Sequence, residues 1–149
     1  MTEVTDGGGP ANQDYNQLIV DQINDAYLDF SGSISVDWNF SGGALPIKIT
    51  QIQLRVGADC ENRDPVNWSL YGKTATGGFE TLFAFSHTTI YRYGGRSTLY
   101  TYDLSKIGTY TGLRLNANRF GAPSIGGTGF CTDSNIQIAY YGITGCFFV

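Results

Sequence analysis

The sequence predicts an all-β domain, an antiparallel jelly-roll β-sandwich of about eight strands. Three observations favour this fold class. The chain is rich in glycine, with 20 residues, and in aromatic side chains, at 14%, whereas charged side chains reach only 15%. Short apolar runs alternate with polar residues at a period of two, which is typical of strands with one buried face. No stretch has a convincing helical period, and a chain of 149 residues fits one domain.

The clearest strand covers residues 34–40, where apolar and polar side chains alternate without a break. A second alternation covers residues 47–56, but it changes phase halfway, between Ile49 and Ile52. One extra residue in a strand shifts all later side chains to the opposite face. The sequence therefore predicts a β-bulge near Thr50 and Gln51.

A core hairpin is predicted after Pro65, which sets the entry to the next strand. Trp68 and Leu70 share one side of this strand, and Gly77-Gly78 closes a turn into the apolar run 79–85. Residues 18–30 have mixed apolar spacing and receive no firm assignment. Further strands are expected over residues 98–104, 110–116 and 135–141.

Residues 1–16 are predicted to form a flexible acidic arm, followed by a sandwich domain over 17–149. The arm is polar and contains Gly7-Gly8-Gly9-Pro10, so it cannot bury enough apolar area to hold itself in place. Every charged residue before Lys48 is acidic, and the net charge is -4, which argues against nucleic-acid binding. Two interpretations stay open: a solvated arm, or an arm that lies on the basic side of a neighbouring copy.

The cysteines Cys60, Cys131 and Cys146 form an odd set without C-x-x-C spacing, which argues against a zinc site and a full disulfide framework. We expect free buried thiols, and a Cys131–Cys146 bridge stays open for an oxidising compartment. No cleavable secretion signal is recognisable, and no apolar stretch has the length of a membrane span. The location of the protein is therefore undetermined.

Several short segments occur in the order seen in a known family. They are Ser35-Val36-Asp37, Ile52-Gln53-Leu54-Arg55, Asp64-Pro65 through Leu70-Tyr71-Gly72, Gly77-Gly78-Phe79 through Leu82, Gly112-Leu113-Arg114-Leu115, and Ile136-Gln137-Ile138-Ala139 through Gly142. Over about residues 26–142 the chain thus resembles the discoidin-like, galactose-binding-domain-like family. That family includes membrane-binding domains of coagulation factors and many carbohydrate-binding modules. The sequence departs from the family pattern at Tyr140 or Tyr141, where an acidic residue is common, and between Leu28 and Ile34, where the long first binding loop is nearly absent.

The resemblance implies that the variable loops 57–64 and 86–97, with 117–132 alongside, gather at one end of the sandwich. These loops supply aromatic faces and planar hydrogen-bond donors, which suit sugar rings and hydroxyls. The candidate ligand-binding residues are Arg63, His87, Tyr91, Arg92, Tyr93, Arg96, Asn118, Arg119 and Phe120. The same residue types are favoured at protein–protein interfaces, so both uses stay open.

The resemblance also implies a structural calcium site near the oxygen-bearing side chains of Asp21, Asn24, Asp25 and Asp29. The alternative is that these residues only cap turns. A second acidic cluster, Asp59, Glu61 and Asp64, lies in another loop. No other cofactor is predicted.

The sequence offers no obvious set of catalytic residues, because His87 is the only histidine and the glutamates are widely scattered. We therefore expect a protein that is not an enzyme and that works by binding. The main hypothesis is a subunit of a larger particle, such as a viral or phage capsid, decoration or tail protein, whose partners are copies of itself or other subunits. The alternative is a stand-alone, lectin-like carbohydrate-binding module. The apolar tail 146–149 either returns to its own core or docks on another subunit.

Overall fold

The structure, a computed structural model, describes residues 2–5, 27–29, 32–56, 63–86, 99–119 and 136–147. The described residues form nine strands and no α-helix. The strands are β1 (Thr2–Thr5), β2 (Tyr27–Asp29), β3 (Ser33–Asn39), β4 (Leu45–Val56), β5 (Asn67–Lys73), β6 (Phe79–Ser86), β7 (Leu99–Tyr110), β8 (Gly112–Asn118) and β9 (Ile136–Phe147).

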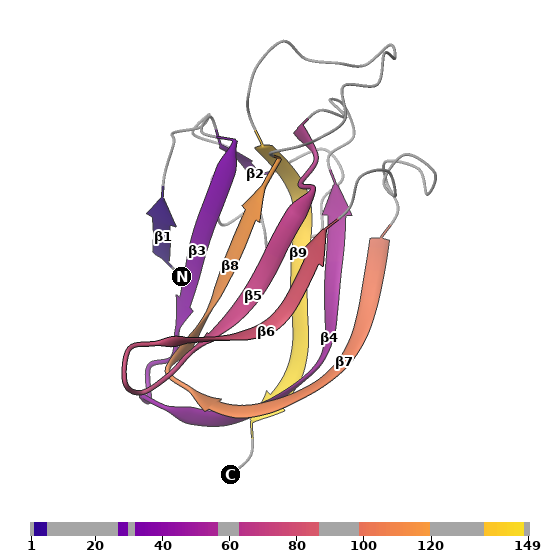
Figure 1. The fold of residues 1–149 in the computed structure, drawn as a ribbon. Coiled ribbons are helices and arrows are strands. Elements are labelled where there is room, and N and C mark those ends of the chain that lie inside the picture. Colours follow the sequence, from indigo (N-terminus) through magenta and orange to yellow (C-terminus); the bar gives the residue numbers. More distant parts are fainter. Residues whose placement is uncertain are drawn as a thin grey trace, which may run out of the picture.

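The strands build two antiparallel sheets that face each other (Figure 1). One sheet has the order β1-β3-β8-β5-β6, and the other has the order β2-β9-β4-β7. The predicted antiparallel β-sandwich is thereby confirmed. The described residues contain nine strands rather than about eight, because the short strands β1 and β2 lie in segments without an alternating pattern.

Strand β1 falls within the predicted flexible arm and pairs with β3, with Thr2 opposite Asp37. The remainder of residues 1–16 lies outside the described residues. The division into an arm and a domain therefore stays a prediction.

The core between the sheets is built from the alternating apolar positions of the strands. Trp68 and Leu70, the two residues expected on one side of the hairpin, are 2% and 0% exposed. The Trp68 ring lies 5.1–5.8 Å, between centroids, from four other aromatic rings, those of Phe83, Phe85, Tyr102 and Tyr141. Because Tyr102 and Tyr141 belong to the opposite sheet, Trp68 joins the two sheets, and the predicted core hairpin is confirmed.

The predicted bulge in β4 is confirmed as well. The pairing of β4 with both of its neighbours shifts register between Ile49 and Gln51. As a result, Ile49 before the bulge and Ile52 after it are both buried, although they are three positions apart. The bulge lets one long strand keep its apolar side chains on the inner face of the sheet.

Two strands are longer than the sequence predicts. Strand β7 runs on to Tyr110, and its second half alternates poorly because it contains exposed positions such as Ile107, which is 65% exposed. Thr111 then crosses to the other sheet, so the strand predicted over 110–116 is in fact β8, which runs from 112 to 118. Strand β9 was expected to end at Tyr141 but continues to Phe147.

The extra length of β9 shows where the first two residues of the tail lie, and one of them is Cys146. Residues 146 and 147 pair with β4, opposite Lys48 and Ile47. Cys146 is a free thiol, but it is exposed, so the expectation of a buried thiol is wrong for this residue because it occupies an outward position of β9. Cys60 and Cys131 lie outside the described residues.

The two ends of the sandwich differ in their connections. At one end, named the turn end, short turns such as 41–44 and 74–78 join the strands, and Gly43 and Gly77 adopt positive φ angles of 81° and 84° there. At the other end, named the loop end, β4, β6 and β8 end and β5, β7 and β9 begin (Figure 1), so residues 57–62, 87–98 and 120–135 connect strands that stop or start there. The predicted grouping of long connections at one end therefore agrees with where the described strands start and stop.

Candidate functional site

The loop end of the five-stranded sheet is held together by backbone hydrogen bonds between three strands. The Val66 N–H, just before β5, donates to the Asn118 carbonyl at 3.0 Å. The N–H of Arg119, just after β8, donates to the carbonyl of Gly32, just before β3, at 3.1 Å. These bonds continue the sheet past its last paired residues. They hold the backbone of Asn118 and Arg119 between β3 and β5 at the loop end of the sheet.

Polar side chains form a row on the outer face of the same sheet at this end. Ser86 Oγ donates to Asn67 Oδ1 at 2.6 Å, and Asn67 Nδ2 donates to Asn118 Oδ1 at 3.3 Å. The three residues occupy opposite register positions in β6, β5 and β8. This row, which the sequence analysis missed, fixes the Asn118 amide, because its oxygen is engaged by a neighbouring strand.

Asp64 lies just before β5, at the loop end of the same sheet. It is only 5% exposed, and together with burial its charge raises the pKa of Tyr100 in β7. Burial is the larger of the two causes. The Asp64 carboxylate thus lies near the start of β7, in the opposite sheet, so both sheets contribute to the loop end. Arg63, its neighbour in the chain, is half-buried.

The structure describes three of the nine predicted ligand-binding residues: Arg63, Asn118 and Arg119. All three lie at the loop end of the sandwich. The other six, His87, Tyr91, Arg92, Tyr93, Arg96 and Phe120, lie outside the described residues. The predicted site as a whole stays a prediction.

The predicted calcium site also falls largely outside the described residues. Asp29 ends β2, whereas Asp21, Asn24 and Asp25 are not described. Of the second acidic cluster, only Asp64 is described. Within the described ranges, no group of three or more His, Cys, Asp or Glu residues is arranged to hold a metal ion. Calcium binding therefore stays a prediction.

On the outer face of the five-stranded sheet, a cluster of charged side chains forms ion pairs among its own members. Asp37 is 4% exposed and accepts two bonds from Arg114, at 2.6 Å from Nε and 2.9 Å from Nη2. Lys73 Nζ donates to Asp37 at 3.0 Å and to Asn39 at 2.8 Å. The Arg114 guanidinium also lies 4.4 Å from the centroid of the Phe79 ring. Because these charges satisfy one another, we assign the cluster to stability.

The pKa of Asp37 is set by burial and by these two basic partners, which act in opposite directions. Burial alone raises the pKa, because it disfavours the charged carboxylate. The hydrogen bonds and charges of Arg114 and Lys73 act in the opposite direction and prevail, so the pKa of Asp37 lies below its usual value. Asp37 is therefore ionised at neutral pH.

No described helix is long and apolar enough to cross a membrane. No family model matches the sequence, and the search of curated proteins finds no significant match. Many solved structures, in contrast, have a fold similar to that of this chain.

Three of these structures show how similarity to this chain varies in TM-score, sequence identity and coverage. A family 62 carbohydrate-binding module from Clostridium thermocellum has a TM-score of 0.65 and 16% identity, with 98% of this chain and 93% of that chain covered. The family 32 module of NanJ from Clostridium perfringens, solved in complex with galactose, has a TM-score of 0.60 and 13% identity, covering 95% and 90%. An F5/8 type C domain from Bacteroides fragilis has a TM-score of 0.59 and 9% identity, covering 89% and 81%.

At these identities the likeness shows the fold, and the coverage shows that it extends over nearly the whole chain. The chain therefore has the discoidin-like, galactose-binding-domain-like fold that its short sequence segments indicated.

Proposed function

We propose that this chain is a non-catalytic carbohydrate-binding module that holds a glycan at the loop end of the sandwich. One observation carries the proposal. The connections 57–62, 87–98 and 120–135 join strands at one end of a fold shared with solved carbohydrate-binding modules, one of them in complex with galactose. The described residues Arg63, Asn118 and Arg119 lie at that end.

The chemistry of the loop residues supports this proposal. An arginine presents planar N–H donors that can bridge neighbouring sugar hydroxyls, and an asparagine amide offers a donor and an acceptor side by side. Tyrosine and phenylalanine rings pack against the C–H face of a sugar ring. The sequence places Tyr91, Tyr93 and Phe120 in the same connections as Arg92 and Arg96. We assign galactose-type sugars as the first ligands to test.

The hypothesis that the chain is a subunit of a larger particle has less support than carbohydrate binding. Among the solved structures of this fold described above are two carbohydrate-binding modules, and the comparisons do not favour a capsid, decoration or tail role. Carbohydrate binding, the alternative from the sequence, therefore becomes the main proposal. An enzymatic function has no supporting observation among the described residues.

The proposal can be tested with a glycan array on the full chain, followed by calorimetric titration with the strongest hit and with galactose. We expect Arg63→Ala and Arg92→Ala each to weaken binding at least tenfold, because each removes charge-assisted hydrogen bonds worth about 1.5–3 kcal/mol. Their melting temperatures should stay within a few degrees of the parent. Lys106→Ala is the control, since Lys106 is exposed and lies toward the turn end of β7.

An array without hits would refute carbohydrate binding. A hit whose affinity is unchanged in both arginine variants would refute the loop end as its site.

A further inference from the structure

The outer face of the five-stranded sheet carries short polar side chains in the half next to the loop end. Figure 1 shows β3, β8, β5 and β6 lying side by side in this sheet. The registers align their outward residues in two rows, named the polar rows. The rows are Ser33, Asn118, Asn67 and Ser86, and then Ser35, Asn116, Ser69 and Ala84. None of these side chains is charged, so this half of the face is neutral.

Two amide groups in the polar rows have N–H donors without a partner. Asn116 Oδ1 accepts from Ser35 Oγ at 2.7 Å, and Asn118 Oδ1 accepts from Asn67 Nδ2 at 3.3 Å. The Nδ2 groups of Asn116 and Asn118 make no hydrogen bond with the described residues, and neither nitrogen is fully buried. The bond to each oxygen orients its amide. The N–H donors are therefore held in place for an acceptor such as a sugar hydroxyl.

Two aromatic rings, named the aromatic platform, follow on the same face toward the turn end. Tyr71 is the next outward residue of β5 after Ser69, and its ring meets that of Phe79 in β6 at 6.2 Å between centroids. Phe79 is 45% exposed. The Arg114 guanidinium, 4.4 Å from the centroid of the Phe79 ring, holds this ring in place. Exposed rings in a fixed position suit the C–H faces of sugar rings.

The polar rows and the aromatic platform form one continuous strip along β5. The strand covers Asn67–Lys73, and at about 3.3 Å per residue the strip is roughly 20 Å long. A single sugar ring covers only a fraction of that length. The strip begins at Asn118, which belongs to the loop end, where the glycan is proposed to bind. A glycan held at the loop end therefore reaches the aromatic platform only if it is a chain of several sugars.

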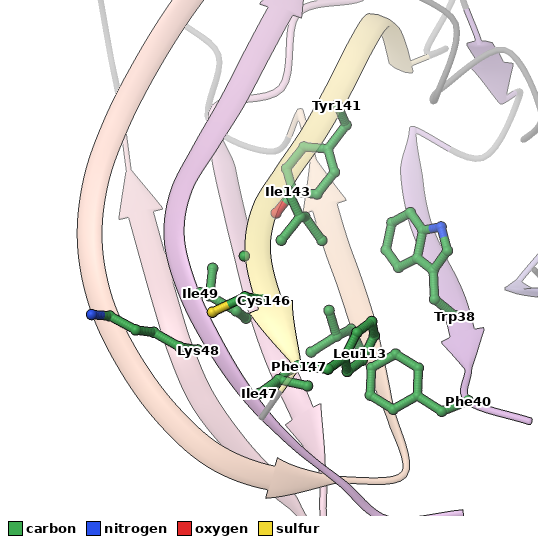
Figure 2. A pocket seen from close by; sticks show the side chains of 11 residues that line it. Trp38, Phe40, Ile47, Lys48, Ile49, Leu113, Tyr141, Ile143, Cys146 and Phe147 are labelled. Atoms are coloured by element: carbon green, nitrogen blue, oxygen red, sulfur yellow. The ribbon is translucent and has the colours of Figure 1, made fainter. Parts of the chain in front are cut away.

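The interior of the sandwich is a poor alternative for the further sugars. A groove of about 300 Å³ lies between β3 and β8 on one side and β4 and β9 on the other. Figure 2 shows Trp38 and Phe40 on one side of it, with Tyr141 and Ile143 on the other. A sugar in this mainly apolar groove would lose the water bound to its hydroxyls and gain few protein partners. The strip on the outer face, in contrast, offers both donors and rings.

We propose that the strip is a second part of the glycan site and that the ligand is a neutral oligosaccharide. One end of this oligosaccharide binds at the loop end, and its further sugars lie along the outer face of the five-stranded sheet. The inference rests on the proposed function and adds the length and charge of the ligand to it. A neutral chain fits because the polar rows hold no charge, and because Asp37, Arg114 and Lys73 beside them pair with one another.

Two probes separate the loop end from the strip: galactose, and the linear tetrasaccharide β-1,4-galactotetraose. Binding to the full chain is measured by calorimetric titration. We expect the tetrasaccharide to bind about tenfold more tightly than galactose or better. Asn116→Ala and Tyr71→Ala should each weaken binding of the tetrasaccharide about three- to tenfold, through the loss of one hydrogen bond or one ring contact. Binding of galactose should be unchanged in both variants, since it occupies the loop end alone.

Gln53→Ala is the matched control for Asn116→Ala, because Gln53 is a half-buried amide on the outer face of the other sheet. It should leave both affinities unchanged. Ser69→Trp places a bulky ring in the middle of the polar rows. It should lower the affinity for the tetrasaccharide to that for galactose, without changing the affinity for galactose itself.

The inference is overturned if the tetrasaccharide binds no more tightly than galactose, or if neither probe binds. Unchanged binding of the tetrasaccharide by both Asn116→Ala and Tyr71→Ala, or by a folded Ser69→Trp variant, also overturns it. Should Ser69→Trp fail to fold, the comparison of Asn116→Ala with Gln53→Ala decides. Equal affinity for the two probes refutes the strip and leaves binding at the loop end intact, whereas a glycan array without hits refutes the proposed function itself.

Discussion

Asp37 shows how a single residue can be misjudged when its partners are distant in the sequence. In the chain it is one of a run of acidic residues, and the alternation of β3 points it to the outer face. In the structure it is 4% exposed, since Arg114, 77 residues away, and Lys73 close over it. Removing one member of such a group leaves the other charges without their partner, and that loss exceeds the worth of an ordinary surface pair.

We predict that Asp37→Asn lowers the free energy of unfolding by about 2–3 kcal/mol at pH 7, measured by urea denaturation. The pKa of Asp37 is lowered in the folded state, so its stabilisation is complete above the unfolded pKa of about 3.9 and is lost as the pH falls through the folded value. The difference between parent and variant should therefore shrink below about pH 4.

Asp103→Asn is the control, because Asp103 is exposed and accepts one bond from Gln51 at 3.0 Å. Its effect should stay within about 0.5 kcal/mol. A difference between the parent and Asp37→Asn that is as large at pH 3 as at pH 7 would contradict the assigned ion pairs.

Among the elements, β4 has the largest share in organising the sandwich. It pairs with β7 on one side and β9 on the other, and its bulge shifts both pairings at the same place. The bulge keeps Ile52, Leu54 and Val56, each at most 1% exposed, on the inner face. It also brings the β4 backbone so close to Gly145 of β9 that a Cβ atom there would collide with the Lys48 carbonyl.

We predict that deletion of Thr50 prevents folding. The deletion removes the extra residue of the bulge, so it would turn Ile52, Leu54 and Val56 outward or break the strand. Exposing three such side chains costs about 5–9 kcal/mol, comparable with the whole stability of a domain. Thermal unfolding followed by circular dichroism should show no cooperative transition.

Thr50→Ala is the matched control, since it keeps the residue count and loses only an exposed 3.3 Å bond to the Thr144 carbonyl. It should unfold cooperatively, within a few degrees of the parent. A deletion variant that unfolds like the parent would show that the bulge is not needed.

At the scale of the whole molecule, the two ends of the sandwich differ in how their strands are connected. Short turns and paired strands close the turn end, whereas β4, β6 and β8 end and β5, β7 and β9 begin at the loop end (Figure 1). The end of β9 belongs to the turn end, where Phe147 is 61% exposed and still packs against Phe40. The tail therefore contributes to its own domain.

We predict that a chain truncated after Gly145 folds but loses about 1–2 kcal/mol, which corresponds to a fall of roughly 2–8 °C in melting temperature for a domain of this size. The loss has two sources, the pairing of residues 146 and 147 with β4 and the contact with Phe40. Ile107→Ser, a change at a similarly exposed apolar residue, should alter the melting temperature little.

Size measurement completes this test. An unchanged melting temperature together with loss of an oligomer would instead support the docking alternative for the tail.

The candidate site was less accessible to sequence reasoning than the fold. Arg63, Asn118 and Arg119 could be assigned to one end because the resemblance placed their loops there. Asn67 and Ser86 could not be found, since their partnership with Asn118 depends on the register of three strands.

The sequence by itself determined the alternation of β3, the bulge of β4, the shared inner side of Trp68 and Leu70, and that the chain forms a β-sandwich. These features follow from the local alternation of apolar and polar residues, which acts over a few positions. Only the tertiary structure decided that β3 neighbours β8, that Asp37 meets Arg114, and that the Tyr141 ring stacks on that of Trp38. Such contacts join residues far apart in the chain, so their geometry depends on how two complete sheets pack together.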